Sequence, residues 1–331
     1  MRAAWYDRQG PAAEVIEIGE LPTPEPGPGE VRVRLACSGV NPSDNKRRSG
    51  FGGQKMTAPR FVPHSDGAGI VDQVGAGADP ALLGQRVWLF NGQRNGRNMG
   101  TAAEYITLDA WLVAPLPDDV SFAEGACLGI PAVTAHRALF ADGPVTGKTV
   151  LVTGGAGAVG NYAIQLAKWG GAAQVIATVS SADKAKLAEA AGADLAVNYR
   201  TDDVAAAVMQ ATGGVGVDHV VEVAFGANQA TTLAVLKTHG IVATYASDID
   251  PTPTLAFYAF MRKNAVLRWV YMYEIPDTAF AQARDDITAW LASGPTQHPV
   301  ARTFPLAETA AAHDYLDAGS ATGTVLIAVD R

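Results

Sequence analysis

The chain has 331 residues, of which 48% are hydrophobic, so it is long enough for about two domains with sizeable cores. Its net charge of −8 provides no general attraction to nucleic acid or to an anionic membrane surface. Two cysteines, Cys37 and Cys127, are too few for a disulfide framework or a cysteine-built zinc site. The first ten residues lack the apolar core of a signal peptide. We therefore expect a cytoplasmic protein with no nucleic-acid or membrane partner.

The first part of the chain, residues 1–123, is predicted to be mainly β-strand. It contains a Pro-rich connector, "LPTPEPGPGE", and apolar runs that Pro and Gly interrupt at 30–41, 68–77, 85–90 and 103–108. The last part, residues 273–331, carries an amphipathic helix at 280–294 and ends in the strand-like run "GTVLIAV". We expect these two parts to pair in one domain, a partly open β-barrel.

The middle part, residues 124–272, alternates between strand and helix patterns. Six strand candidates are separated by helical segments, and they occur at 149–153, 174–179, 195–199, 217–224, 241–247 and 265–273. This alternation predicts an α/β domain with a doubly wound parallel sheet covered on both faces.

Two later features admit simple structural interpretations. Trp269, Tyr271 and Tyr273 alternate along the last strand candidate and would share one face, which fits core, dimer surface or cleft lining. We favour core or interface. Asp285 and Asp286 are assigned to a solvated helix face.

Two overlapping stretches resemble phosphate-binding loops. Residues 143–149 have one residue too few between their first Gly and the Gly-Lys-Thr, and a strand follows instead of a helix. Residues 154–160 have the better context, because a short apolar strand precedes them and a helical pattern follows. Their glycines would let backbone N–H groups approach a pyrophosphate at the helix N-terminus. The spacing G-x-x-G-x-x-G is less common than G-x-G-x-x-G and is weak evidence by itself.

The end of the second strand bears on the choice of dinucleotide. A carboxylate about 20 residues past the glycine motif usually holds the ribose of NAD, but Ser180 stands there. Lys184 follows closely and would attract a 2′-phosphate. Two alternatives remain, an exposed helix-start role for Lys184 and a displaced ribose ligand at Asp183.

Several stretches in a constant order resemble the zinc-free medium-chain dehydrogenases/reductases of the quinone oxidoreductase, or zeta-crystallin-like, family. They cover nearly the whole chain: "GVNPSDNKRRSG", "PHSDGAGIVDQVG", "GIPAVTAHRAL", "GKTVLVTGGAGAVGNYAIQLAK", "AGADLAVNYR" and "FPLAETAAAHDYLDAGSATGTVLIA". The resemblance implies a Rossmann domain at 124–272 and a GroES-like domain formed by 1–123 and 273–331.

The same resemblance implies the cofactor NADPH and its contacts. It assigns the 2′-phosphate to Lys184 and Tyr199 with Ser180 beside them, and the nicotinamide to Asn41 and Thr134. It assigns the pyrophosphate to Ala156, Gly157, Ala158 and Val159. The chain departs from the family where Gly157-Ala158 replaces two glycines and where Thr324 replaces a lysine. Lys46 and Phe51 replace tyrosines that often line the substrate cleft in the family. The identity of the substrate is therefore the property that the resemblance supports least.

A catalytic zinc is not expected. Zinc enzymes of the same architecture place Cys and His ligands where this chain has Asn41 and Ser65, and residues 91–104 contain no cysteine for a structural zinc lobe. His64 is one position away from the ligand position, and a lone histidine is more often structural.

The resulting prediction is an NADPH:quinone oxidoreductase that transfers hydride to a small molecule without a metal. Reduction of α,β-unsaturated carbonyls, such as enones, alkenals or enoyl thioesters, and a non-catalytic NADPH-binding role remain alternatives. Ser43 and the Asn41 amide are the candidate catalytic groups that would donate to the acceptor's oxygen, although Ser43 is also a natural turn residue. A homodimer is expected, because the apolar strand 265–273 would lie at a sheet edge.

Overall fold

The computed structural model describes residues 1–319 and 321–329, which form two compact units. Unit 1 combines residues 1–130 with the described part of 298–331, and unit 2 comprises residues 131–297. No helix among the described residues is long and apolar enough to cross a membrane.

The unit boundaries differ from the predicted ones at 123 and 272, because helix α10 (Asp277–Ala292) belongs to unit 2. Its Trp290 packs edge-on against Tyr162 with ring centroids 5.9 Å apart. Its Asp286 is half-buried and accepts a hydrogen bond from the buried His136 at 2.8 Å, so the solvated-face assignment was wrong for Asp286. The same assignment is confirmed for Asp285, whose side chain is 66% exposed.

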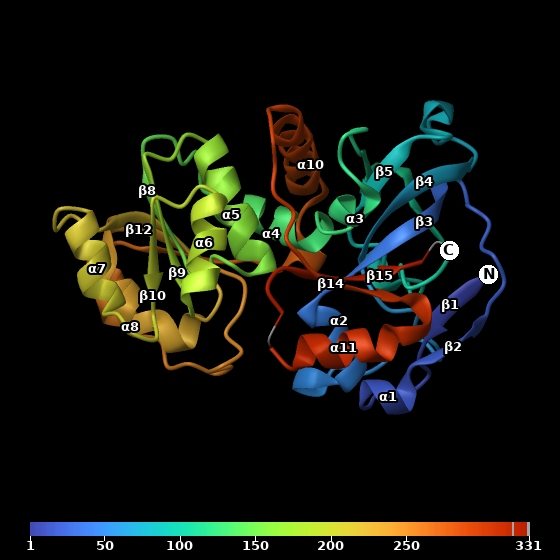
Figure 1. The fold of residues 1–331 in the computed structure, drawn as a ribbon, viewed down its shortest axis with the longest axis horizontal. Coiled ribbons are helices and arrows are strands. Elements are labelled where there is room, and N and C mark those ends of the chain that lie inside the picture. The colour runs from blue at the N-terminus through green and yellow to red at the C-terminus, as the bar shows by residue number, and fades with distance from the viewer. Residues whose placement is uncertain (320, 330–331) are drawn as a thin grey trace. The chain divides into compact units, whose positions relative to one another are not determined.

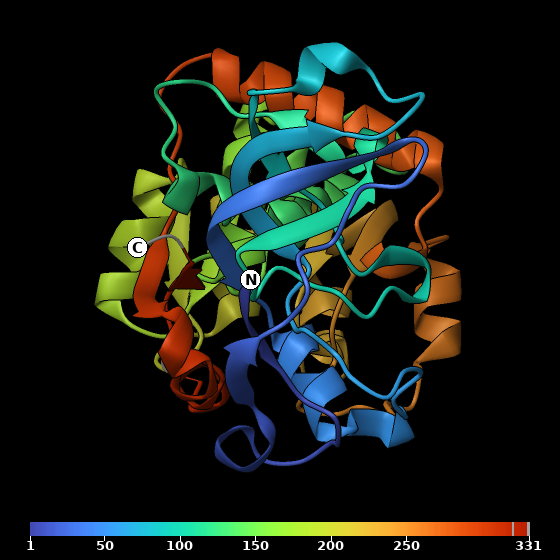
Figure 2. The ribbon, with the colours of Figure 1, turned by 90° about the vertical axis from the view of Figure 1, so that its right-hand side faces the viewer.

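Unit 1 is built on a curved seven-stranded sheet that forms the predicted partly open barrel (Figure 2). The strand order is β14-β15-β3-β4-β5-β7, with β6 also on β3. The bounds are β3 (Glu30–Val40), β4 (Asp66–Val74), β5 (Arg86–Leu89), β6 (Tyr105–Asp109), β7 (Val113–Pro115), β14 (Val300–Pro305) and β15 (Thr324–Ala328). A separate hairpin pairs β1 (Arg2–Trp5) with β2 (Glu17–Glu20).

The long strand β3 holds unit 1 together. Its last residues pair antiparallel with β15, with Val40 opposite Val325 and Cys37 opposite Ala328. The N-terminal part and the C-terminal part of the chain therefore share one sheet, as predicted. Four helices complete the unit: α1 (Ala12–Val15), α2 (Pro42–Ser49), α3 (Phe122–Gly125) and α11 (Thr309–Asp317).

Unit 2 contains a six-stranded parallel sheet with the order β10-β9-β8-β11-β12-β13 (Figure 1). Its strands are β8 (Thr149–Val152), β9 (Gln174–Val179), β10 (Leu195–Asn198), β11 (Val217–Glu222), β12 (Leu236–Thr244) and β13 (Val266–Trp269). All six predicted strands are present, although β13 ends at Trp269 and excludes Tyr271 and Tyr273.

The chain returns to the middle of this sheet after β10, so the strand order reverses between β8 and β11. Right-handed crossovers then place the helices of the two halves on opposite faces. Helices α5 (Ala158–Trp169) and α6 (Ala182–Ala190) contact each other and β9, whereas α7 (Val204–Ala211) contacts α8 (Phe225–Val235). Helices α4 (Gly129–Phe140) and α9 (Phe257–Arg262) complete the unit with α10.

The turn between β8 and α5 depends on glycine at particular positions. Gly154 has a φ of +69°, and a Cβ on Gly160 would lie only 2.2 Å from the Gly154 backbone oxygen. Gly157 is less constrained, since its Cβ would lie 3.3 Å from the same oxygen. Only glycine at 160 allows α5 to begin this close to the end of β8.

The two glycines provide a matched test of this turn. Gly160→Ala is expected to lower the free energy of unfolding by about 2 kcal/mol, because backbone must move to admit the methyl group. Gly157→Ala is expected to lower the free energy of unfolding by less than about 1 kcal/mol. Chemical unfolding of both variants measures the difference, and equal stabilities would contradict this account of the turn.

Candidate functional site

A cavity of about 410 Å³ opens in unit 2 at the carboxyl ends of β8, β9, β10 and β11. This position spans the point where the strand order reverses, which is where open α/β sheets bind their ligands. Its lining is Leu151, Thr153, Gly154, Thr178, Tyr199, Asp202, Val204, Val223, Ala224, Asn228, Thr231, Thr232 and Ile249. The mixture of apolar walls and a few polar groups suits a nucleotide.

The N-terminus of α5 lies directly after the glycine turn and contributes unpaired donors. Gly157 is its N-cap and offers no side chain, so the first backbone N–H groups of the helix have no capping partner. The turn is fixed on β9 by two bonds, from the Gly154 N–H to Thr178 Oγ1 and from the Gly155 N–H to the Thr178 oxygen. Within the stretch Ala156–Val159, the Gly157 N–H already donates to the Gly154 oxygen at 2.9 Å, and the N–H groups of the other three residues are the ones that fit a pyrophosphate.

The residues predicted to meet a 2′-phosphate are all in unit 2. Ser180 follows β9, and Lys184 lies in the first turn of α6, where Ser181 accepts from its backbone N–H. No described residue forms an ion pair or hydrogen bond with the Lys184 ammonium. Tyr199 is 53% exposed and lines the cavity.

Two carboxylates near this group are already occupied. Asp183 pairs with Lys186 at 3.0 Å and is 91% exposed, so it faces solvent. Asp202 accepts from Thr201 Oγ1 at 2.9 Å and from the Asn198 N–H at 3.1 Å. Asp183 therefore lacks the inward orientation that a displaced ribose ligand requires, whereas Asp202 lines the cavity.

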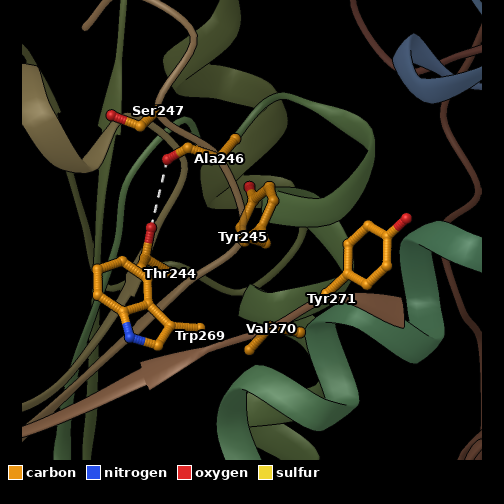
Figure 3. A pocket seen from close by; sticks show the side chains of 7 residues that line it. All are labelled: Thr244, Tyr245, Ala246, Ser247, Trp269, Val270 and Tyr271. Atoms are coloured by element: carbon orange, nitrogen blue, oxygen red, sulfur yellow. Dashed lines mark hydrogen bonds between the residues drawn. The ribbon is translucent and has the colours of Figure 1, made fainter. Parts of the chain in front are cut away.

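A second hollow, of about 230 Å³, lies at the carboxyl ends of β12 and β13 (Figure 3). Tyr245 projects from the end of β12, and Trp269 and Tyr271 project from the end of β13. Trp269 is 63% exposed and Tyr271 is 58% exposed. The core interpretation of these two residues was therefore wrong, and they line a hollow, whereas the favoured alternative of an interface stays a prediction.

Tyr245 was missed in the sequence. Burial raises the pKa of its hydroxyl, and the nearby Glu222 carboxylate adds to the effect. The hydroxyl therefore keeps its proton at physiological pH and can donate a hydrogen bond. Only its place at the end of a parallel strand, in "IVATYAS", was available as a signal. Thr134, the predicted nicotinamide contact, is buried on α4 in the same unit.

The predicted catalytic residues, Asn41 and Ser43, lie at the start of α2 in unit 1. Asn41 is the N-cap of that helix, and its backbone N–H donates to the Asp44 carboxylate at 2.8 Å. Its Nδ2 donates to Asp66 Oδ2 at 2.7 Å, which leaves one amide N–H for another partner. Ser43 is half-buried in the first turn of the same helix.

Burial has the largest effect on the pKa values of the two carboxyl groups around Asn41. It raises the pKa of Asp44 to about 7, against the lowering effect of its backbone hydrogen bonds. It raises the pKa of Asp66 well above its usual value, and the nearby Asp44 adds to this shift. The Ile130 N–H donates to the second oxygen of Asp66 at 2.8 Å. These hydrogen bonds stabilise both carboxyl groups, and the positive charge of Arg47 also lowers the pKa of Asp44.

A chain of buried hydrogen bonds runs behind this group. Arg48 Nε lies 3.2 Å from His313 Nδ1, and since Arg48 only donates, that nitrogen accepts. The proton of neutral His313 is then on Nε2, which donates to His64 Nε2 at 2.8 Å. His64 accordingly carries its proton on Nδ1, which lies 2.8 Å from Ser38 Oγ.

This chain of hydrogen bonds ends on the backbone carbonyl group of Asp66. Ser38 Oγ lies 2.7 Å from Thr101 Oγ1, which donates to the Asp66 oxygen at 2.5 Å. Every member therefore donates in the same direction. His64 is a structural residue with both ring nitrogens engaged, although its φ of +77° is unusual for a non-glycine residue.

These contacts are unsuitable for a metal. Asn41 and the buried Ser65 stand at the ligand positions, His64 uses both nitrogens, and the carboxylates bond to amide groups. Among the described residues, no cluster of three His, Cys, Asp or Glu side chains has the arrangement of a metal site.

Comparisons with known proteins agree with this architecture. Residues 27–118 match the family model described as an alcohol dehydrogenase GroES-like domain, and residues 158–289 match the model described as a zinc-binding dehydrogenase. The human quinone oxidoreductase is 29% identical over 321 residues, which cover 95% of this chain and 94% of that protein. A chloroplastic quinone oxidoreductase of Triphysaria versicolor is 33% identical over 272 residues, or 80% and 79% of the two chains.

Solved structures are similar over the whole chain. An NAD-dependent alcohol dehydrogenase is 31% identical with a TM-score of 0.88, and the match covers 100% of both chains. A mycobacterial protein solved with NADPH is 30% identical with a TM-score of 0.85, covering 99% of this chain and 100% of that one. One of these two proteins is NAD-dependent and the other binds NADPH, so the choice between NADH and NADPH depends on this chain's own residues.

The histidine pair makes stability depend on pH. Burial lowers the pKa of His64 from 6.5 to about 3 and that of His313 well below 6.5, with His64 and Arg48 adding to the shift in His313. The unfolded chain then binds more protons at these two histidines, so their contribution to the free energy of unfolding should fall as the pH decreases below about 6.5. The raised pKa values of Asp44 and Asp66 act in the opposite direction. The other charged or titratable groups that contact the pair are Arg48 and Asp44.

His313→Gln keeps an acceptor and a donor but cannot be charged. It should therefore remove about one proton from the uptake on unfolding, which lowers the slope of the free energy of unfolding against pH by ~1.4 kcal/mol per pH unit. Chemical unfolding between pH 7 and pH 4.5 measures the slope. The exposed His239 provides the control through His239→Asn, which should leave the slope unchanged. Identical slopes in wild type and His313→Gln would contradict the assignment of two neutral, buried histidines.

Proposed function

Because the chain belongs to the medium-chain dehydrogenase/reductase family, we propose that it reduces quinones by hydride transfer from NADPH without a metal. The aromatic hollow formed by Tyr245, Trp269 and Tyr271 carries this proposal. It lies in the β11–β13 half of the sheet, next to the larger cavity, and presents planar side chains to a planar acceptor.

The bound dinucleotide would supply the hydride, and the protein supplies position and electrostatics. The N–H groups within Ala156–Val159 would bind the pyrophosphate, and Lys184, Tyr199 and Ser180 would bind the 2′-phosphate. Thr134 and Asn41 are the proposed nicotinamide contacts. The free Lys184 ammonium and the outward-facing Asp183 support NADPH over NADH.

A quinone needs little help from acid catalysis, because it accepts hydride readily and solvent can protonate the product. We assign the remaining donation to the acceptor's oxygen to Asn41, through its second amide N–H, and to Ser43. The hydrogen bonds that satisfy Asp66 and His64 support a metal-free reaction. A cytoplasmic location and a small-molecule acceptor as the sole substrate complete the proposal.

An acceptor assay tests the proposed activity. NADPH oxidation should proceed with a kcat/KM at least about tenfold higher for 1,4-naphthoquinone than for 2-hexenal, and it should survive chelation. Trp269→Ala should lower the quinone kcat/KM about tenfold, because a stacking surface is lost. Trp169→Ala removes a partly exposed indole at the far end of α5 and should have no such effect. A preference for the alkenal would favour enone reduction, and NADPH binding without turnover would favour a non-catalytic protein.

The cofactor preference is tested at Lys184. Charge-assisted hydrogen bonds contribute roughly 1.5–3 kcal/mol, so Lys184→Ala should lower kcat/KM for NADPH by about one to two orders of magnitude. NADH has no 2′-phosphate, so kcat/KM for NADH should be nearly unchanged. Equal losses for both cofactors, or a wild type that favours NADH, would contradict the assignment.

We also propose a homodimer. The outer edge of β13 and helix α9 expose a cluster of large apolar side chains, here called the edge cluster: Leu255, Phe257, Tyr258, Met261, Val266 and Trp269. A hollow of about 290 Å³ lies within it, lined in part by Phe260 and Leu267. An apolar strand edge of this kind is normally covered, and a second copy of the chain would cover it.

Light scattering at micromolar concentration should give the mass of a dimer. Met261→Lys, which places a charge in the edge cluster, should shift the equilibrium to monomer. Leu187→Lys on α6 is the matched control, because it lies at the opposite part of the sheet and should leave the dimer intact. A monomeric wild type would remove the proposal.

A further inference from the structure

A buried carboxylate lies beneath the cavity at the reversal of strand order. Glu222 ends β11 and is 0% exposed. Its Oε1 accepts from Thr153 Oγ1 at 2.9 Å, from the Ala224 N–H at 2.6 Å and from Asn228 Nδ2 at 2.8 Å. All three donors belong to residues that line the cavity.

This contact fixes the orientation of the Asn228 amide. A backbone N–H can only donate, so the Ala224 bond makes Glu222 Oε1 an acceptor, and as a carboxylate this group has no proton to donate to Asn228. The amide atom of Asn228 that faces it must therefore be the NH2 group. Rotation of the amide by 180° would bring two acceptors together and is excluded.

The amide oxygen of Asn228 is left for a ligand. No described residue hydrogen-bonds this oxygen, and it is absent from the fully buried unpaired atoms. Asn228 lines the cavity together with Leu151, Val204, Val223 and Ile249, which provide apolar surface for the faces of a ring. The cavity thus offers an amide acceptor of fixed direction beside these apolar side chains.

The adenosine half of the dinucleotide is the part that fits here. Tyr199 and Lys184, the groups suited to a 2′-phosphate, lie at the β9–β10 side, and that phosphate is carried by the adenosine ribose. The aromatic hollow lies on the β12–β13 side, where the nicotinamide half would extend. If the adenine ring enters the cavity, its exocyclic amino group is its one strong exocyclic hydrogen-bond donor.

We propose that Asn228 is a specificity-determining residue that accepts a hydrogen bond from the adenine amino group, and that Glu222 is the positioning residue that holds it. This inference rests on the proposed function only in requiring that the chain bind NADPH. A purine with an oxo group at the same position would place an acceptor against the Asn228 oxygen, which cannot rotate away.

Binding of NADPH and of its hypoxanthine analogue, deamino-NADPH, tests the proposal by calorimetry. Wild type should bind the analogue at least about fivefold more weakly. Asn228→Ala should bind NADPH more weakly but show a ratio close to one. Thr231→Val, a neighbouring cavity residue without a contact to Glu222, should keep the wild-type ratio.

The role of Glu222 is tested by its amide. Glu222→Gln retains an Oε1 acceptor for Asn228 and Ala224, so it should keep the discrimination between the two cofactors, whereas a role that depends on charge would lose it. Equal affinity of wild type for NADPH and its analogue, or an unchanged ratio in Asn228→Ala, would overturn the inference and leave the proposed function intact. Absence of NADPH binding would instead reject the proposed function.

Discussion

The Glu222 carboxylate is the contact on which the cofactor unit most depends. The strand order reverses between β8 and β11, so two helices diverge at the carboxyl ends and leave a crevice. Glu222 bridges this crevice by bonding to Thr153 after β8 and to Ala224 and Asn228 at the start of α8. Burial of the carboxylate raises its pKa, and these hydrogen bonds oppose the shift. The burial is tolerated because every bond also orders a wall of the cavity.

Unit 1 also contains buried carboxyl groups whose burial must be compensated. Asp44 and Asp66 are buried carboxyl groups that lie near each other. They are compensated by amide donors from Asn41 and Ile130. The positive charge of Arg47 also lowers the pKa of Asp44. This arrangement fixes Asn41 in place and still leaves one of its N–H groups free to act on a ligand.

The sequence predicted features that depend on local periodicity and on glycine. All six strands of unit 2 and the turn at Gly154 are visible in this way, because apolar runs and backbone conformations are properties of neighbouring residues. The observed boundary of unit 2 differs from the predicted one, since α10 is assigned by contacts of Trp290 and Asp286 with residues far away in the chain. The pairing of His64 with His313 has the same origin.

The aromatic residues at the end of β13 were misinterpreted for another reason. Alternation of Trp269, Tyr271 and Tyr273 predicts one shared face only if the strand continues, but β13 ends at Trp269 and a short 3-10 turn follows. Alternation also says nothing about whether a face is covered. Lys184 was indicated by its distance from the glycine motif, whereas Tyr199 came from the family resemblance, which local patterns could not have supplied.

Trp269 belongs both to the edge cluster and to the aromatic hollow, which links assembly to acceptor binding. Its indole packs edge-on against Phe225 at 5.5 Å and is otherwise largely exposed, so only one side of it is held by its own unit. A second copy on the edge of β13 would cover the other side and restrict its rotamers. A surface that stacks a planar ring well must lose little side-chain entropy on binding. Pairing at this edge would therefore make the hollow a better site for a quinone, although the partner need not touch the acceptor itself.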